Sequence, residues 1–408
     1  MGIKLSIRAL LGILLGTLLG LYLPDRAGDT GALFGELSDL VISIGRFFLF
    51  PLVFFSAITA VDELREESKL LSTLLWTLAL VLVTTLGSVV IALATILIFA
   101  PERIPPILQE GEPLITGTLG EILSTVFPRN LFSLFAADGD ALLPVLVLAF
   151  LLGAVLRHDR HVTDPVAAVV DSASRIFYRL SGVVTEFIGI GLIAVAAHFI
   201  LTLRRTSELV IYRQLILVVG VAVLLIAVIF YPLALYLLQK RRSPAGWLAS
   251  MVAPALQAAV SGDLYFAYPT LVRAVSRQRN VGRRRGATIL PVATIFGRAG
   301  SAAVTAATFV VVIRSYTALE IGVAQILWIL LFAVLFSLML SRFPAAGVPV
   351  LLGTMAARYG QGMEEAYLIV LPVIPVLLRL GAFLDILTAG FIVEILGPSE
   401  QKKQSKRR

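Results

Sequence analysis

The sequence predicts an all-α integral membrane protein with eight transmembrane helices and two opposed re-entrant helical hairpins. Hydrophobic residues make up 58% of the 408 residues, charged residues make up only 15%, and the mean hydropathy is +0.93. A soluble domain carries about 25% charged and about 45–50% apolar residues. The apolar stretches are long and do not alternate with polar residues, which argues against a transmembrane β-barrel.

The 34 basic and 26 acidic residues leave a formal net charge of +8. Basic residues gather at the ends of apolar stretches and at the C-terminus, where they orient helices and contact anionic lipid head groups. We therefore expect the lipid bilayer, and no nucleic acid, as a partner. The chain has no cysteine, and it shows no His-Glu-x-x-His pattern or catalytic triad. These features argue against an enzyme and against any resident cofactor.

Crossing a bilayer core takes about 20 apolar residues in a helix. The chain offers eight such stretches, at about residues 5–23, 37–61, 71–100, 141–156, 177–203, 213–238, 286–313 and 366–396. The first is followed by Pro24-Asp25-Arg26 and by no small-residue cleavage site, so we expect an uncleaved span. It carries Gly12, Gly16 and Gly20 on one face, which fits either close helix packing or a sliding surface.

Basic clusters predict how the spans are oriented, because positive loops stay in the cytoplasm. Eight spans with both termini cytoplasmic place the main clusters inside: Arg157 with Arg160, Lys240-Arg241-Arg242, Arg283-Arg284-Arg285 and the basic tail at 399–408. The acidic loop 101–140 is then extracytoplasmic, whereas Arg204, Arg205 and Arg213 do not fit this topology. We expect a multi-pass protein of the cell membrane, the inner membrane of a bacterium.

Two further apolar stretches, 244–276 and 322–357, must enter and leave the membrane on one side. The first lies between cytoplasmic clusters and breaks near Ser261-Gly262, and the second lies between external ends and breaks at 342–347. At ~1.5 Å per residue, the halves of the first are too short to cross a ~30 Å core twice. Opposed hairpins, each followed by a span, form inverted repeats, which in transporters place the substrate near the midplane.

Ionisable residues within these segments cost at least ~2.5–3.5 kcal/mol each and need a partner or a cavity. They are Asp263 at the first tip, Arg298 in the seventh span, Arg342 at the second tip, and Arg379 and Asp385 in the last span. Arg298 either forms a structural ion pair with Asp263 or Asp385, or it binds an anionic substrate with its planar guanidinium. Arg46 and Glu186 are interpreted as interfacial or packing charges, and Asp171 with Arg175 as an exposed helical pair.

The candidate binding residues follow from these positions. For the substrate they are Asp263, Tyr265, Arg298, Gly300, Ser301, Arg379 and Asp385. Asp263 and Asp385 are also candidates for carrying a coupling proton. For a gate at the second tip they are Arg342, Pro344, Ala345 and Gly347, because a mobile lid needs a turn with few fixed contacts.

Five short motifs follow one another along nearly the whole chain: Arg46 through Ser56, Leu143-Pro144 through Leu152-Gly153, Tyr268-Pro269, Ala293-Thr294-Ile295 and Pro344-Ala345-Ala346-Gly347. Together they resemble the dicarboxylate/amino acid:cation symporters, the glutamate-transporter homologues. The resemblance implies a homotrimer and an elevator mechanism. It implies a scaffold part at about 1–61 and 141–203, and a sliding transport part at about 71–100 and 213–396. It also implies uptake of an amino acid or a C4-dicarboxylate with sodium or protons.

The chain departs from the family pattern at the site itself. The family's Asn-Met-Asp-Gly-Thr motif reads Phe296-Gly297-Arg298-Ala299-Gly300 here, so Arg298 stands where the family has a sodium-binding aspartate. In the last span, the family's substrate-binding arginine falls on Gly381 or Ala382, and one of its sodium positions falls on Ala389 or Gly390. Because an arginine repels cations, the family's sodium site is degraded here.

We therefore expect a secondary active symporter for a small organic solute, a carboxylate or an amino acid, by an elevator mechanism. Arg298 and Arg379 would supply the positive charge. The coupling cation would be a proton rather than sodium. Two alternatives on the same scaffold stay open: an uncoupled anion exchanger or channel, and a degenerate member that does not transport.

Overall fold

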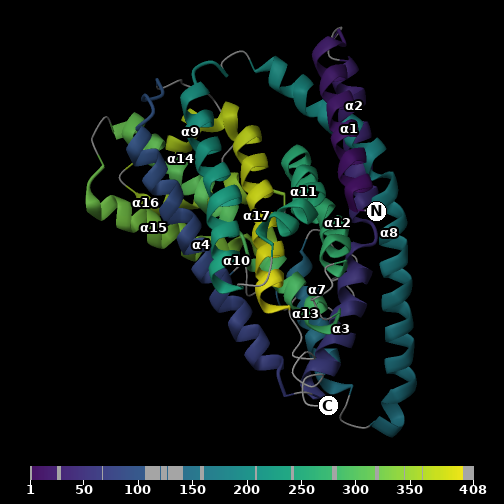
Figure 1. Ribbon diagram of the computed structural model, residues 1–408. Coiled ribbons are helices and arrows are strands. Elements are labelled where there is room, and N and C mark those ends of the chain that lie inside the picture. Colours follow the sequence, from purple (N-terminus) through teal and green to yellow (C-terminus); the bar gives the residue numbers. More distant parts are fainter. Residues whose placement is uncertain are drawn as a thin grey trace.

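The computed structural model describes residues 2–24, 29–66, 68–105, 120, 126, 141–156, 160–206, 209–239, 243–277, 283–317, 321–343, 345–360 and 362–397. Within these ranges every regular element is a helix, as predicted (Figure 1). Most of the loop at 101–140, the residue Pro344 and the tail at 399–408 lie outside the described residues.

The described residues of the first half of the chain form six helices. They are α1 (Gly2–Tyr22), α2 (Asp29–Arg46), α3 (Leu49–Glu66), α4 (Leu70–Phe99), α7 (Leu142–Val155) and α8 (Arg160–Arg205). The second half is more broken. Its elements are α9 (Arg213–Leu224), η1 (Leu225–Phe230), α10 (Tyr231–Leu238), α11 (Pro244–Ser261), α12 (Leu264–Ser276), α13 (Arg283–Phe296), α14 (Ala299–Thr317), α15 (Val323–Ser337), η2 (Leu338–Arg342), α16 (Gly347–Tyr359), η3 (Ala366–Val373) and α17 (Ile374–Leu396).

Eight helical segments in the described residues are long and apolar enough to cross a membrane. Seven of them overlap predicted spans, and the set differs at one place. The helix Leu142–Val155, in a predicted span, has only 14 residues, or ~21 Å. The segment Val323–Ser341, in the predicted second hairpin, has 19 residues, or ~28 Å. The sequence predicts a span at 141–156 because this stretch is strongly apolar, although it is short.

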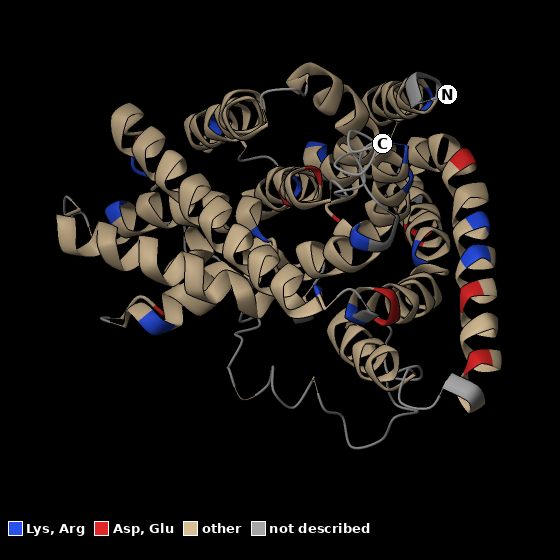
Figure 2. Cartoon of the chain, turned by 60° about the horizontal axis from the view of Figure 1, so that its bottom comes forward, with Lys and Arg blue, Asp and Glu red and all other residues tan. Residues whose placement is uncertain are grey.

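The exposed surface is apolar, as the composition indicates. Large apolar side chains stay exposed along many helices, for example Leu71 of α4 (70%), Phe187 of α8 (65%) and Leu237 of α10 (64%). Figure 2 shows charged residues only sparsely distributed over the cartoon. A soluble protein rarely exposes so large a contiguous apolar area, and a lipid-facing one does. The described helices therefore support a multi-pass membrane protein.

The helices form two groups. α1 and α2 pack lengthwise on the long helix α8, and α3 packs on α7 and α8, at the right of Figure 1. α4, α11, α13 and α14 pack around α17 in the other group. Most of the segment Arg285–Thr317 is buried, so α13 and α14 occupy the centre of the fold. Arg298 and Asp385 of the last two predicted spans therefore lie deep inside the protein.

The glycine stripe of α1 serves close packing within the chain. A Cβ placed at Gly12 would overlap the carbonyl oxygen of Gly189, and one at Gly16 would overlap that of Ile193, both on α8. Only a bare backbone allows the two helices to approach so closely. Of the two readings of this stripe, the structure supports helix packing.

Gly12→Ala is therefore expected to lower the free energy of unfolding by about 1–3 kcal/mol, because α1 must shift away from α8. The measurement is the melting temperature in detergent. Gly182→Ala, on α8 with no heavy atom within 4 Å of the added Cβ, is the control and should stay close to wild type. Equal melting temperatures for the two variants would contradict this packing.

Candidate functional site

The first helical turnaround lies where the sequence predicts a tip. α11 ends at Ser261, the next residue Gly262 has a φ of 72° in the left-handed region, and Asp263 directly precedes α12. The Asp263 Oδ1 accepts hydrogen bonds from the backbone N–H groups of Tyr265 (2.8 Å) and Phe266 (3.2 Å). This is an N-cap, which satisfies donors that the first turn leaves open. The other carboxylate oxygen of Asp263 forms an ion pair with Arg46 of α2.

The seventh span is unwound at the predicted place. α13 ends at Phe296, Gly297 and Arg298 are not helical, and α14 begins at Ala299. The buried carboxylate of Asp385 caps α14 from α17. Its Oδ1 accepts from the N–H groups of Gly300 (2.7 Å) and Ser301 (2.9 Å), and its Oδ2 accepts from the Ser301 hydroxyl (2.6 Å).

Arg298 lies between this cap and the second tip. Its Nη1 is 3.5 Å from the Asp385 Oδ2, and the two side chains are 1% and 0% exposed. Its Nη2 donates to the carbonyl of Phe343, which directly follows η2, at 3.2 Å. Of the two partners foreseen for Arg298, the structure selects Asp385. The pair is fully desolvated, so it needs each of these hydrogen bonds.

The second tip packs against Ser301, one of the residues that bind Asp385. A Cβ placed at Gly347, the first residue of α16, would overlap the Ser301 hydroxyl oxygen and lie 3.1 Å from the Ser301 Cβ. Gly381 of α17 meets Val348 and Ser301 in a similar way. Ala345 is half-buried beside this contact. The backbone of Arg342 ends η2, but its side chain, like all of Pro344, lies outside the described residues.

Arg379 faces away from Asp385, six residues later on the same helix. Its Nε donates to the carbonyl of Val260 (2.9 Å) and its Nη1 to that of Pro375 (2.9 Å). The guanidinium carbon lies 3.8 Å from the ring centroid of Phe199 on α8. Among the described residues no carboxylate forms an ion pair with Arg379, and its Nη2 makes no hydrogen bond.

The predicted residues therefore fall into three neighbouring groups. Arg298, Gly300, Ser301 and Asp385 form one cluster under Gly347, which we call the α14 cap cluster. Asp263 joins Arg46 at the first tip, and Tyr265, two residues further on, is buried. Arg379 stands by itself at the end of α11.

The sequence does not indicate two further polar residues close to these groups. Arg46, which the sequence predicts to be an interfacial or packing charge, forms an ion pair with Asp263. Its position at the end of a helix, before two phenylalanines, carries no signal for a partner more than 200 residues away. Gln257 on α11 is fully buried, and neither of its amide atoms has a hydrogen-bond partner in the described part of the chain. A buried polar group without a partner costs about 1–3 kcal/mol.

Among the residues that the structure describes, acidic side chains do not form a cation site by themselves. In the described residues no group of three or more His, Asp or Glu side chains comes together. The nearest alternative is a row of buried hydroxyls, in which the Tyr231 hydroxyl lies 2.6 Å from the Thr388 Oγ1 and 3.4 Å from the Ser88 Oγ.

Comparison with known proteins decides the family. The sequence matches the family model for the sodium:dicarboxylate symporter family over residues 5–392. The chain belongs to this family. The resemblance seen in the sequence motifs is thereby confirmed, and the sodium:dicarboxylate symporter family is a family of membrane transport proteins.

Individual curated relatives have low sequence identity to this chain. The chain is 27% identical over 198 residues to a C4-dicarboxylate transport protein of Anaeromyxobacter sp. (strain K), a match covering 46% of this chain and 44% of that protein. It is 23% identical over 197 residues to a C4-dicarboxylate transport protein of Paraburkholderia phymatum, covering 46% and 45%. The matches span less than half the length of these relatives.

Proposed function

We propose that this member of the sodium:dicarboxylate symporter family is a secondary active transporter for a small carboxylate or amino acid. The observation that carries the proposal is Arg379, a half-buried guanidinium with no carboxylate partner among the described residues and one terminal nitrogen free of hydrogen bonds. A buried cation is costly unless an anion offsets it, and a planar guanidinium binds a carboxylate well. Family membership and the relatives named for C4-dicarboxylate transport support the same substrate class.

The architecture proposed for this function is that of an elevator. The turnarounds at Gly262 and at 343–346 would be the tips of two re-entrant hairpins, entering from opposite faces as inverted repeats. The scaffold part, about 1–61 and 141–203, would hold a homotrimer together, and the transport part, about 71–100 and 213–396, would move. The packing of α1, α2 and α3 against α8 supports the scaffold. We place both termini in the cytoplasm of a bacterial cell.

The second tip is proposed as the gate over the substrate. It touches the α14 cap cluster through the hydrogen bond from Arg298 to the Phe343 carbonyl and through the contact of Gly347 with Ser301. Both contacts are local and few, as a lid requires. The unpartnered amide of Gln257 would lie on the other wall, as a polar group of the first hairpin that a ligand or water can satisfy.

A thermal-shift screen against organic acids and amino acids tests the substrate class, because specific binding raises the melting temperature by mass action. For a carboxylate that binds, Arg379→Gln should weaken the affinity about tenfold to a hundredfold, the worth of a charge-assisted hydrogen bond. Arg379→Lys should fall in between, because it keeps the charge and loses the planar fork. Arg175→Gln, an exposed arginine of α8, is the control and should bind like wild type. Equal affinity of Arg379→Gln and wild type would reject this role.

Sodium is not expected to be an obligatory coupling ion, because Arg298 occupies an acidic position of the family's sodium site and binds Asp385. A proton is proposed instead, carried by Asp263 or Asp385. Asp263 accepts from two backbone N–H groups and Asp385 accepts from Gly300 and Ser301, so a proton on either carboxylate would compete with these donors.

Uptake into proteoliposomes should therefore persist when choline replaces sodium on both sides and should collapse when the proton gradient is dissipated. Uptake that strictly follows a sodium gradient would contradict the prediction. Equilibration without accumulation under any gradient would instead point to the uncoupled exchanger or channel, and specific binding without uptake would point to a member that does not transport.

A further inference from the structure

The contacts between α12 and the pair α2 and α8 lead to one further inference, which rests on the division into scaffold and transport parts proposed above. In that division α12 is on the moving side, and α2 and α8 are on the stationary side. Polar contacts across this boundary must break whenever the moving part is displaced. They occur at both ends of α12.

At its N-terminal end, α12 is held to α2 by the ion pair between Asp263 and Arg46. The two side chains are 3% and 23% exposed, so water screens the pair only in part. Because Asp263 is also the N-cap of α12, the pair holds the end of the helix itself. The adjacent Phe266 is fully buried in an apolar cluster with Ala9 of α1 and Leu192 of α8.

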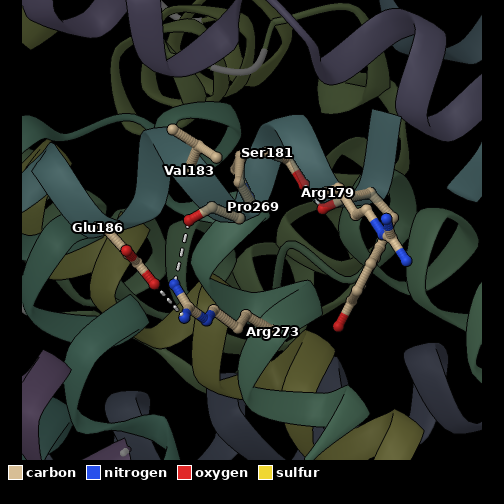
Figure 3. A pocket seen from close by; sticks show the side chains of 8 residues that line it. Arg179, Ser181, Val183, Glu186, Pro269 and Arg273 are labelled. Carbon is tan, nitrogen blue, oxygen red and sulfur yellow. Dashed lines mark hydrogen bonds and ion pairs between the residues drawn. The ribbon is translucent and has the colours of Figure 1, made fainter. Parts of the chain in front are cut away.

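At its C-terminal end, α12 is held to α8 by three hydrogen bonds, of which Figure 3 shows those of Arg273. Arg273 donates from Nη1 to the carbonyl of Gly182 (3.1 Å) and from Nη2 to Glu186 (2.8 Å). The Tyr178 hydroxyl lies 2.6 Å from the Ser276 Oγ. A cavity of about 260 Å³ lies beside these side chains. The contacts of Arg273 line this cavity, so the C-terminal end of α12 has room to move beside them.

We propose that these contacts form a latch that holds the first hairpin against α2 and α8, and that release of the latch is a step in each transport cycle. The two ends are ~20 Å apart along α12, the length of its 13 residues. A hydrogen bond is lost beyond ~3.5 Å, so a slide of a few ångströms along α8 breaks all of the contacts together. The rate at which these contacts break would then determine how long the protein stays in the conformation described here.

A disulfide trap across the boundary measures that lifetime. A Cβ placed at Gly45 of α2 would lie 3.6 Å from the Cγ of Phe266, which is within reach of a disulfide if both residues are replaced by cysteine. The chain has no cysteine of its own, so Gly45→Cys with Phe266→Cys has no background reaction. Size-exclusion chromatography and the melting temperature verify that this pair folds. Oxidation should stop uptake and a reductant should restore it.

The latch is tested in this background by Glu186→Gln with Ser276→Ala, which removes the negative charge that pairs with Arg273 and the hydroxyl that bonds Tyr178. We expect disulfide formation to slow by about fivefold, the effect of losing contacts of this kind, with unchanged affinity for any carboxylate found in the thermal-shift screen. The charge exchange Glu186→Arg with Arg273→Glu should recover the rate. Asp171→Asn breaks an exposed pair within α8 and should leave the rate unchanged.

Two outcomes separate the latch from the elevator. A crosslinking rate that stays within twofold of the parent pair in the Glu186→Gln, Ser276→Ala variant would overturn the latch, even if the oxidised pair stops uptake. Undiminished uptake by the fully oxidised pair would overturn the division into moving and stationary parts, and with it both proposals.

Discussion

Asp385→Ala is expected to lower the free energy of unfolding by about 3–5 kcal/mol, the cost of leaving one member of a buried ion pair without its partner. The substitution removes three hydrogen bonds that cap α14 and leaves Arg298, which is 1% exposed, without its carboxylate. The measurement is thermal unfolding of the purified protein in detergent. For a membrane protein near its stability threshold, this loss shows as poor yield of the folded form.

Two comparisons identify the cause. Asp171→Ala removes an aspartate that also pairs with an arginine, but the pair with Arg175 is exposed, so the expected loss is within about 1 kcal/mol. The double variant Arg298→Ala with Asp385→Asn removes the unpaired charge and keeps an oxygen that can accept from Gly300 and Ser301. It should recover much of the stability. A double variant as unstable as Asp385→Ala would show that the ion pair is not the cause.

Gly347→Ala is expected to reduce uptake by tenfold or more while the protein still folds. The added Cβ would overlap the Ser301 hydroxyl oxygen, so the second tip cannot rest on the α14 cap cluster. Misplacement of a lid by about 1 Å can cost about a hundredfold in rate. The experiment compares initial uptake rates in proteoliposomes at equal amounts of folded protein.

Gly220→Ala is the matched control for this substitution. Gly220 also lies in a helix, α9, and a Cβ there meets no heavy atom within 4 Å. Replacing a helical glycine with alanine at an open position is neutral or stabilising by about 1 kcal/mol. Uptake by Gly347→Ala at the rate of this control would mean that the second tip does not close over the substrate path.

The breaks in the helices could be predicted from the sequence, because they depend on local residue types. Gly262 takes a left-handed conformation that favours glycine, and Gly297 precedes a charge that cannot sit in a lipid-facing helix. The same holds for the burial of Asp263, Arg298 and Asp385, since charges in apolar spans turn inward. Family membership also followed from motif order.

Pairing between segments could not be predicted in the same way. Whether Arg298 meets Asp263 or Asp385 depends on the rotation of α17 against α14, which tertiary packing decides and local sequence does not. The contact of Gly300 with the backbone of Gly381 brings these helices together in the register that favours Asp385. The sequence proposes Arg379 as a source of positive charge for the substrate, and its six-residue offset from Asp385 turns it towards Phe199 on α8.

The burial of α13 and α14 has a consequence for biogenesis. The segment Arg285–Thr317 is the least apolar of the eight spanning candidates, and it is interrupted by Gly297 and Arg298 near its middle. An arginine at the centre of a segment costs about 2.5–3.5 kcal/mol when the translocon releases it into lipid. We therefore expect this segment to be retained beside the translocon until α17, with Asp385, emerges from the ribosome. The centre of this protein would then enter the lipid only after the last helix, α17, has been synthesised.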